Sequence, residues 1–270
     1  SQVPVLLFTK DRHRSGSLVV TGPLGQRDAV LPADVRVYVF GGAQHSPARG
    51  GSDRGQHPPN PNNYRPVQES LFLAMDRWLT DGTEPPPSVY PRLGDGTLVA
   101  WEAEPSGWQP LPGVAYPTVI QQPEHLNYGE AFERFRRIDH HPPIRTGEAY
   151  TVRVPALDAD NNERGVLRLP RVEVPVATFT GWNLRNPAIG APTELLDLTG
   201  SRIPFPVTSV ERAQSNDPRL AVAERYADFE DYLRRYMAAA EQLVSDRYLL
   251  PEHLAGLKAL AQEHRSLFKE

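Results

Sequence analysis

Residues 35–45 have the sequence Val35-Arg36-Val37-Tyr38-Val39-Phe40-Gly41-Gly42-Ala43-Gln44-His45. The first part is rich in β-branched and aromatic residues, which predicts a buried strand over Val35–Phe40. The two glycines that follow let the chain turn sharply and approach other backbone closely. His45 then stands on a loop directly after a rigid strand, a position typical of catalytic groups. We therefore expect a strand inside a sheet whose end presents one histidine.

The composition excludes several classes of function. The chain has 270 residues, of which 29 are basic and 33 acidic, and a net charge of -4. That length suffices for one large domain or two small ones with an ordinary core. The balanced charge argues against a nucleic-acid partner, which would require a basic surface. No apolar run approaches the roughly 18 residues that a membrane span needs.

Cysteine and proline usage set further limits. The sequence has no cysteine, which excludes disulfides, thiolate metal sites and a cysteine nucleophile. Proline accounts for 28 of the 270 residues, whereas average usage is about 5%. Because the prolines gather in the middle of the chain, we expect long, stiff and ordered loops that cover a scaffold.

Hydrophobic periodicity predicts the remaining elements. Residues 118–150 are expected to be loop. The first predicted strand begins almost at the first residue, and we therefore expect that an N-terminal part of a larger protein precedes it. The predicted strands are Val3–Thr9, Val35–Phe40, Leu98–Trp101 and Val172–Thr180, with a hairpin of Tyr150–Val154 and Gly165–Leu169; the predicted helices are Tyr64–Leu79, Pro218–Tyr226, Ala227–Leu243 and Pro251–Phe268.

Several strings rich in proline, asparagine and tryptophan are distinctive. Through them the chain resembles, from about Val35 onward, the C-terminal portion of the bacterial α/β-hydrolase domain-containing proteins, which are large esterase-like proteins with a long C-terminal extension. The strings are Gly41-Gly42-Ala43-Gln44-His45, Pro59-Asn60-Pro61-Asn62-Asn63-Tyr64-Arg65-Pro66, Asp76-Arg77-Trp78-Leu79-Thr80-Asp81-Gly82-Thr83, Pro85-Pro86-Pro87-Ser88, Tyr90-Pro91-Arg92, Val154-Pro155-Ala156-Leu157-Asp158-Ala159-Asp160, Thr180-Gly181-Trp182-Asn183-Leu184-Arg185 and Gly200-Ser201-Arg202-Ile203-Pro204-Phe205.

The resemblance implies an α/β fold in two parts. Residues 1–82 would hold the last strands, the histidine loop and a helix of an α/β-hydrolase domain. Residues 83–270 would form a proline-rich α+β extension with a β-hairpin region and C-terminal helices. Family members often carry signal peptides, so the resemblance is compatible with a periplasmic or secreted protein without fixing the compartment.

The nucleophile of such an enzyme is missing from this sequence. In the α/β-hydrolase layout a serine in a Gly-x-Ser-x-Gly turn comes first along the chain, followed by the acid and then the histidine. The closest string, Gly50-Gly51-Ser52-Asp53-Arg54, follows His45 and ends in arginine. The resemblance therefore implies that the nucleophile lies upstream, in a missing N-terminal segment or a separate chain.

Two residues are the candidate catalytic groups. His45 would be the base that takes the serine proton, and its alternative role is to cap a loop. Asp11 would be the acid that orients the histidine, and its alternative is a solvated loop aspartate. Family members carry a glutamate in a Ser-x-Glu-Tyr-Trp-like string before the histidine. This chain has Thr9-Lys10-Asp11-Arg12-His13 there, so Asp28 and Asp34 stay open as weaker alternatives for the acid.

We expect no metal or cofactor. Asp158-x-Asp160-x-Asn162 resembles a calcium loop only faintly, because Glu163 replaces the required glycine, so a hairpin turn is favoured. His140 and His141 are adjacent and have no third ligand at usable spacing.

The predicted function is carboxylic-ester hydrolysis by a serine, histidine and acid mechanism. The partners would be a small ester substrate and an N-terminal half that carries the nucleophile, and this chain alone would be inactive. The alternative is a non-catalytic binding or scaffold module derived from a hydrolase.

Overall fold

The computed structural model describes residues 5–9, 18–21, 25–47, 53–120 and 122–268. Its first sheet pairs β1 (Val5–Thr9) with β2 (Val35–Val39) in parallel, with Val5 opposite Val35. The connection between them contains the short helix α1 (Leu18–Thr21). Both predicted strands are confirmed within a residue or two of the predicted ends, and the structure shows that they are neighbours.

Strand β2 has backbone partners on both of its edges. Besides β1, it forms parallel bridges from Tyr38 to Val89 and from Phe40, just past its end, to Leu167. The hydrogen bonds from Val89 N to Val37 O and from Val39 N to Val89 O are each 2.9 Å long. Segments far apart in the sequence therefore fix the strand that leads to His45.

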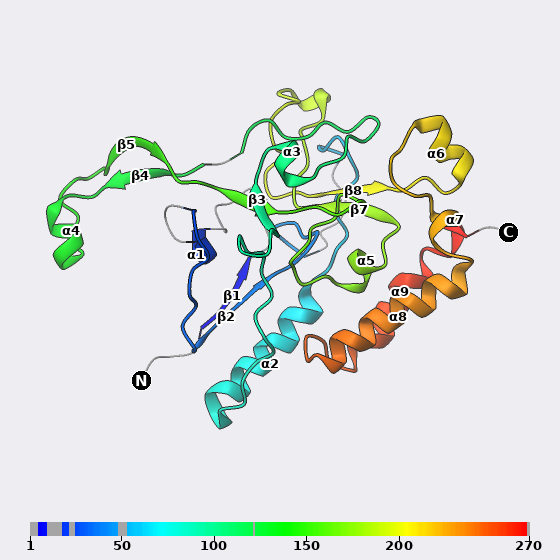
Figure 1. Ribbon diagram of the computed structural model, residues 1–270, viewed down its shortest axis with the longest axis horizontal. Coiled ribbons are helices and arrows are strands. Elements are labelled where there is room, and N and C mark those ends of the chain that lie inside the picture. The colour runs from blue at the N-terminus through cyan, green and yellow to red at the C-terminus, as the bar shows by residue number, and fades with distance from the viewer. Residues whose placement is uncertain (1–4, 10–17, 22–24, 48–52, 121, 269–270) are drawn as a thin grey trace.

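The other sheets are small, antiparallel and two-stranded. They pair β3 (Leu98–Ala100) with β6 (Arg153–Pro155), β4 (Glu124–Asn127) with β5 (Ile144–Ala149), and β7 (Ala177–Thr180) with β8 (Ser201–Pro204). Figure 1 labels these strand pairs and the helices. The α/β class is confirmed, with helices and small antiparallel sheets beside the parallel pair.

Two predicted strand regions are wrong in detail. Residues 153–155 pair with β3 rather than with residues 165–169, where Leu167 instead bridges to Phe40. The predicted strand Val172–Thr180 begins with a short helix, α5 (Pro170–Glu173), because proline suits the first helical turn. Only its second half forms a strand, β7.

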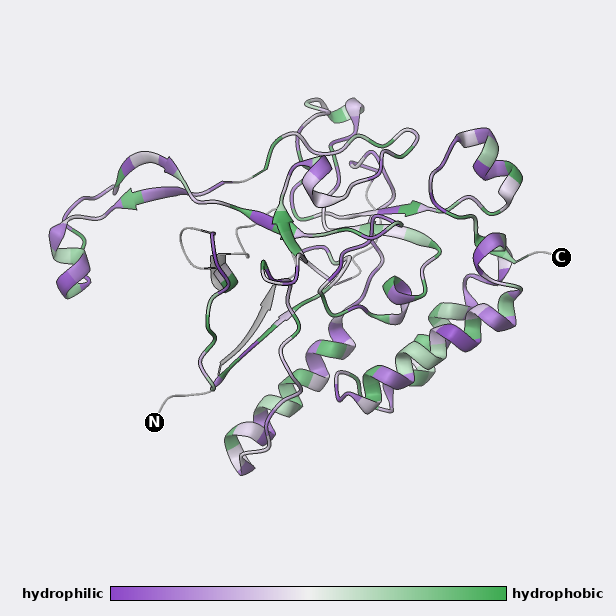
Figure 2. Ribbon diagram, viewed as in Figure 1, coloured by the Kyte–Doolittle hydropathy of each residue, from purple (hydrophilic) through white to green (hydrophobic). Residues whose placement is uncertain are grey.

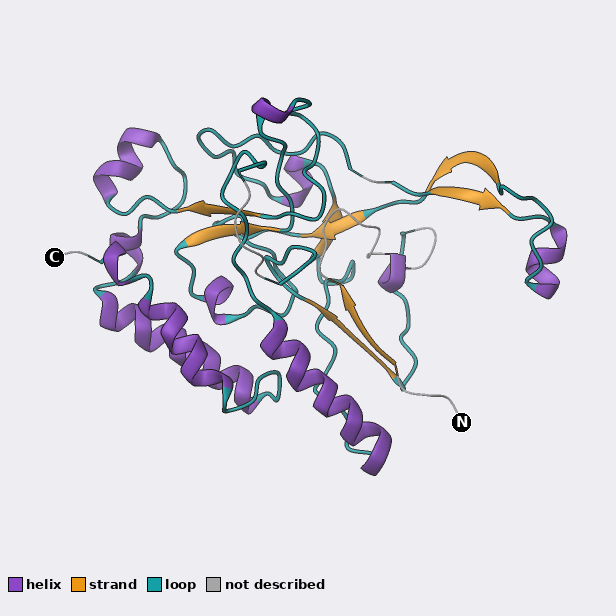
Figure 3. Ribbon diagram, turned by 180° about the vertical axis from the view of Figure 1, so that it is seen from behind, coloured by secondary structure: helices purple, strands orange, loops and turns teal. Residues whose placement is uncertain are grey.

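Residues 118–150, predicted as loop, contain a projecting arm instead. Strand β4, helix α4 (Glu130–Phe135) and strand β5 extend away from the rest of the molecule, as Figures 1 and 3 both show. All six residues of β5 are exposed. The strands escaped prediction because they bury no face and so lack hydrophobic alternation.

Helices form the remaining layer. Figure 2 shows hydrophobic and hydrophilic residues alternating around the two longest, α2 and α8, as expected for amphipathic helices. The helices are α2 (Arg65–Asp81), α3 (Ala103–Ser106), α6 (Ser209–Ser215), α7 (Val222–Arg225), α8 (Phe229–Ser245) and α9 (His253–Gln262), with 3-10 turns at Pro187–Ile189 and Arg265–Leu267. The predictions for α2 and α8 are confirmed, whereas α7 and α9 are shorter than predicted.

The main core joins β2 to the helices. Tyr38 of β2 and Phe40, just past its end, belong to the same buried cluster as Val67 and Leu71 of α2 and Tyr232 of α8. This cluster takes residues from both sides of position 82, and the division of the chain at that point stays a prediction. Among the described residues, no helix is both long and apolar enough to cross a membrane.

Candidate active site

The histidine loop, residues 41–45, is mostly buried. Residues 41–44 are buried and His45 is half-buried. Gly42 has a φ of +55°, a conformation that side chains disfavour. A Cβ atom at Gly42 would lie 2.9 Å from the Cβ of Phe179 and 3.2 Å from its carbonyl oxygen. Only glycine therefore lets the chain turn here, between β2 and His45.

Two buried asparagines hold the carbonyl groups of both glycines. Asn60 donates to the carbonyl of Gly42 over 2.8 Å and to that of Thr180 over 2.9 Å. Asn62 donates to the carbonyls of Gly41, over 3.1 Å, and Gly42, over 3.0 Å. Both side chains are no more than 1% exposed. Because buried carbonyls need donors, these amides stabilise the turn in one conformation.

Tyr64 holds the end of the loop. Its hydroxyl donates to the carbonyl of His45 over 2.7 Å and to that of Gln44 over 3.2 Å. Its ring is fully buried and stacks on Phe40, with the ring centroids 5.1 Å apart. The tyrosine thus links the core to the residue that carries the imidazole.

Further contacts come from distant parts of the chain. The carboxylate of Glu163, 6% exposed, accepts a 2.9 Å hydrogen bond from the Gly42 amide. The side chain of Gln44 accepts from the Gly200 amide over 3.0 Å and donates to the carbonyl of Ser46 over 3.0 Å. The loop is therefore held on several sides, and His45 is presented from a fixed backbone.

The candidate acids have different positions. Asp11 lies outside the described residues. Strand β1 is parallel to β2 and its last residue, Thr9, lies opposite Val39, so both strands end at the same edge of the sheet. Asp34 immediately precedes β2, so it lies at the opposite edge from His45, roughly 16 Å of strand away.

Asp28 has a structural role. Its carboxylate accepts hydrogen bonds from the amides of Leu93, over 2.8 Å, and Gly94, over 2.9 Å. These contacts fix the turn that precedes β3, which weakens Asp28 as a candidate acid.

Residues 158–162 form the predicted tight turn, although the strands predicted on either side of it do not pair with each other. One oxygen of Asp158 accepts from the amides of Asp160 and Asn162, each over 2.9 Å. The carboxylates of this turn also pair with arginines, Asp158 with Arg168 over 2.7 Å and Asp160 with Arg225. In the part of the chain that the structure describes, no three histidine or acidic side chains cluster as metal ligands would.

A second histidine, His57, follows His45 in the sequence. Burial lowers the pKa of His57, which favours the neutral imidazole. Its backbone is held by Asn183, whose side chain accepts from the His57 amide over 3.3 Å and donates to the His57 carbonyl over 2.8 Å. We therefore use His57→Ala as the control for substitution of His45.

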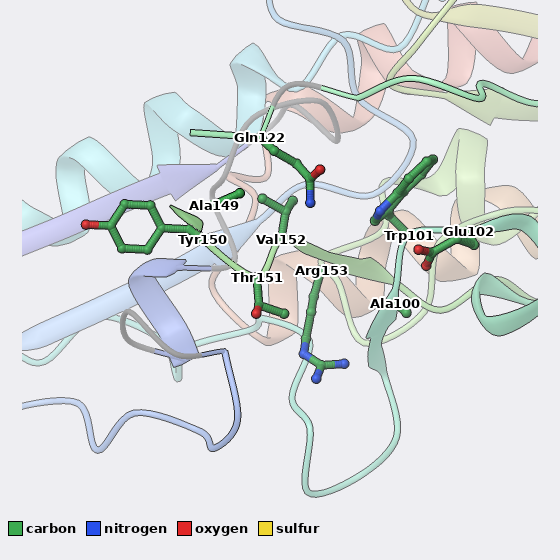
Figure 4. A pocket seen from close by; sticks show the side chains of 9 residues that line it. All are labelled: Ala100, Trp101, Glu102, Gln122, Ala149, Tyr150, Thr151, Val152 and Arg153. Atoms are coloured by element: carbon green, nitrogen blue, oxygen red, sulfur yellow. The ribbon is translucent and has the colours of Figure 1, made fainter. Parts of the chain in front are cut away.

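One small cavity lies at the base of the projecting arm. It has a volume of about 240 Å³, whereas ligand pockets usually measure about 300–1,000 Å³. In Figure 4, Gln122 and Trp101 face one another across it, and Tyr150 points away. Its lining does not include His45. The lining residues are Ala100, Trp101, Glu102, Gln122, Ala149, Tyr150, Thr151, Val152 and Arg153.

Comparison with known families gives one match. A model described as an alpha/beta hydrolase domain matches residues 9–259. The chain belongs to this alpha/beta hydrolase family. Membership suggests hydrolase activity, and the match includes both Asp11 and His45. The chain matches no curated protein and no solved structure.

Sequence reasoning missed the residues that hold the histidine loop. Asn60, Asn62 and Glu163 are separated from Gly42 by 18, 20 and 121 positions. The one available signal was the string Pro59-Asn60-Pro61-Asn62-Asn63-Tyr64, in which polar residues alternate with helix-breaking prolines.

Proposed function

We propose that this alpha/beta hydrolase cleaves carboxylic esters and that His45 is its general base. The observation that carries the proposal is the fixed loop at the end of β2, where side chains bind the carbonyls of Gly41, Gly42, Gln44 and His45. A base must hold its position against a nucleophile to within a fraction of an ångström, and buried hydrogen bonds to the backbone provide that rigidity.

The proposed reaction needs three groups. A serine hydroxyl attacks the ester carbonyl while His45 takes its proton, and His45 then gives that proton to the departing alcohol. Water hydrolyses the acyl-enzyme by the same sequence. We assign the orienting acid to Asp11, because it follows β1 in the sequence as the histidine loop follows β2.

The nucleophile belongs to a part of the enzyme outside residues 1–270 in this proposal. The support is the absence of a Gly-x-Ser-x-Gly string from the sequence. The same part would supply the backbone N–H groups that stabilise the oxyanion. The absence also favours a second candidate function, a binding or scaffold module that is derived from a hydrolase and has no reaction of its own.

A serine-directed fluorophosphonate distinguishes the two functions. In the complete protein, we expect the probe to label one serine outside this chain's 270 residues, located by peptide mass spectrometry. His45→Ala should abolish labelling because the serine then has no base, whereas His57→Ala should leave it intact. Absence of labelling in the complete wild-type protein would favour the binding module.

A further inference from the structure

A group of basic side chains lies between β8, α5 and the C-terminal helices. Arg171 of α5 and His264, just after α9, are each 7% exposed. The Arg171 guanidinium lies 3.5 Å from the Nε2 atom of His264, and the Nδ1 atom of His264 lies 2.7 Å from the hydroxyl of Tyr232 on α8. The imidazole therefore bridges an arginine and a phenol inside the protein.

A second arginine belongs to the same group. Arg202 of β8 stands opposite Phe179 of β7, and its Nε atom is buried without a hydrogen-bond partner. Burial, followed by the positive charge of Arg171, lowers the pKa of Arg202. Burial and the charges of both arginines also lower the pKa of His264 to about 4. Besides burial, both pKa shifts include the repulsion of a neighbouring positive charge.

Within the described ranges, no carboxylate forms an ion pair with either arginine. Arg219 differs from these two arginines, because it is buried together with a counter-ion, Asp217, at 2.6 Å. Glu263, the residue before His264, is exposed, and its negative charge raises the pKa of Tyr236. Partly buried guanidinium groups without a counter-ion are costly, and an anion bound between them would offset that cost.

We propose that Arg171 and Arg202, together with Tyr232 and His264, form a binding site for a small oxyanion of the phosphate type. Each guanidinium presents planar N–H donors that match the oxygens of a phosphate group. The two arginines balance a doubly charged ion, and the phenol and imidazole supply further polar contacts. The site is independent of the proposed esterase reaction.

The first test is thermal unfolding of the complete protein in inorganic phosphate, compared with chloride at equal ionic strength. Phosphate should raise the melting temperature in a saturable way, because it binds the folded state alone. Arg171→Gln and Arg202→Gln should lose this rise. Arg234→Gln, a change on α8 where the side chain is 70% exposed, should keep it. The same measurement with phenyl phosphate tests whether the site accepts a phosphate ester. We expect no rise in melting temperature with phenyl phosphate, because a tight site would accept only the free ion.

General stabilisation by phosphate as an excluded salt would raise the melting temperature of all these variants equally. That outcome, or no rise in the wild type beyond chloride, would overturn the proposal. The second test follows the ring protons of His264 by NMR during a pH titration of the wild type. Bound phosphate should raise the pKa of His264 from its low value, and an unchanged pKa in saturating phosphate would also overturn the proposal.

Discussion

Tyr64→Phe removes one hydroxyl from the core and leaves the ring in place. The hydroxyl donates to the carbonyls of His45 and Gln44, over 2.7 and 3.2 Å, and the ring stacks on Phe40. Phenylalanine can keep the stacking but leaves buried carbonyls without this donor. We expect the free energy of unfolding to fall by about 1–3 kcal/mol.

The same change should also slow catalysis, because the His45 backbone loses its link to the core. A displacement of about 1 Å in a catalytic group can cost roughly 100-fold in rate. We therefore expect kcat for ester hydrolysis by the complete enzyme to fall by about 10- to 100-fold. The melting temperature of the 270-residue chain should fall by roughly 2–4 °C for each kcal/mol lost.

Tyr226→Phe is the matched control. Its hydroxyl donates to the carbonyl of Pro175 over 2.8 Å, and the residue is 6% exposed. This variant should lose similar stability and keep the wild-type kcat. Equal kcat values for both variants would refute the positioning role of Tyr64, and an unchanged melting temperature for Tyr64→Phe would refute the stabilising role of its hydroxyl.

Three further changes test other parts of the structure. Gly42→Ala should lower the free energy of unfolding by about 2–4 kcal/mol in urea titrations, because of its φ of +55° and the 2.9 Å approach to Phe179; a neutral result would contradict the tight turn. Burial lowers the pKa of His264 from 6.5 to about 4. Between these two pH values the unfolded state binds more protons than the folded state, so the free energy of unfolding should fall by up to about 3 kcal/mol as the pH drops through this range. His264→Gln should remove that loss, and a pH profile identical to that of the wild type would exclude this group. Arg219→Met leaves the buried carboxylate of Asp217 unpaired after a 2.6 Å ion pair is broken, and calorimetry should show a loss of about 3–5 kcal/mol; a loss below about 1 kcal/mol, typical of surface pairs, would contradict burial of the charge.

The elements that the sequence predicts well are those whose signal is local. Strand β2 follows from the β-branched run after Asp34, and helices α2 and α8 follow from apolar residues at helical spacing. The pairing of β3 with β6 joins Leu98 to Pro155, and no local pattern specifies a partner that far away. The arm formed by β4 and β5 lacks a buried face and so leaves no hydrophobic pattern.

The same distinction applies to the candidate site. His45 can be picked out because its strand, its glycines and its position are contiguous in the sequence. The roles of Asn60, Asn62 and Glu163 depend on which backbone groups the folded chain brings to them. Their function as hydrogen-bond partners of the loop becomes visible only in three dimensions.

The central claim is that His45 is the catalytic base, and kcat of the complete enzyme tests it most directly. With a chromogenic acetate ester, His45→Ala should lower kcat by about 10³-fold or more. Its thermal melt should stay close to that of the wild type, because alanine keeps the backbone carbonyl to which Tyr64 donates. His57→Ala should retain the wild-type kcat. A near-normal kcat for His45→Ala, or an equal loss in both variants, would contradict the account.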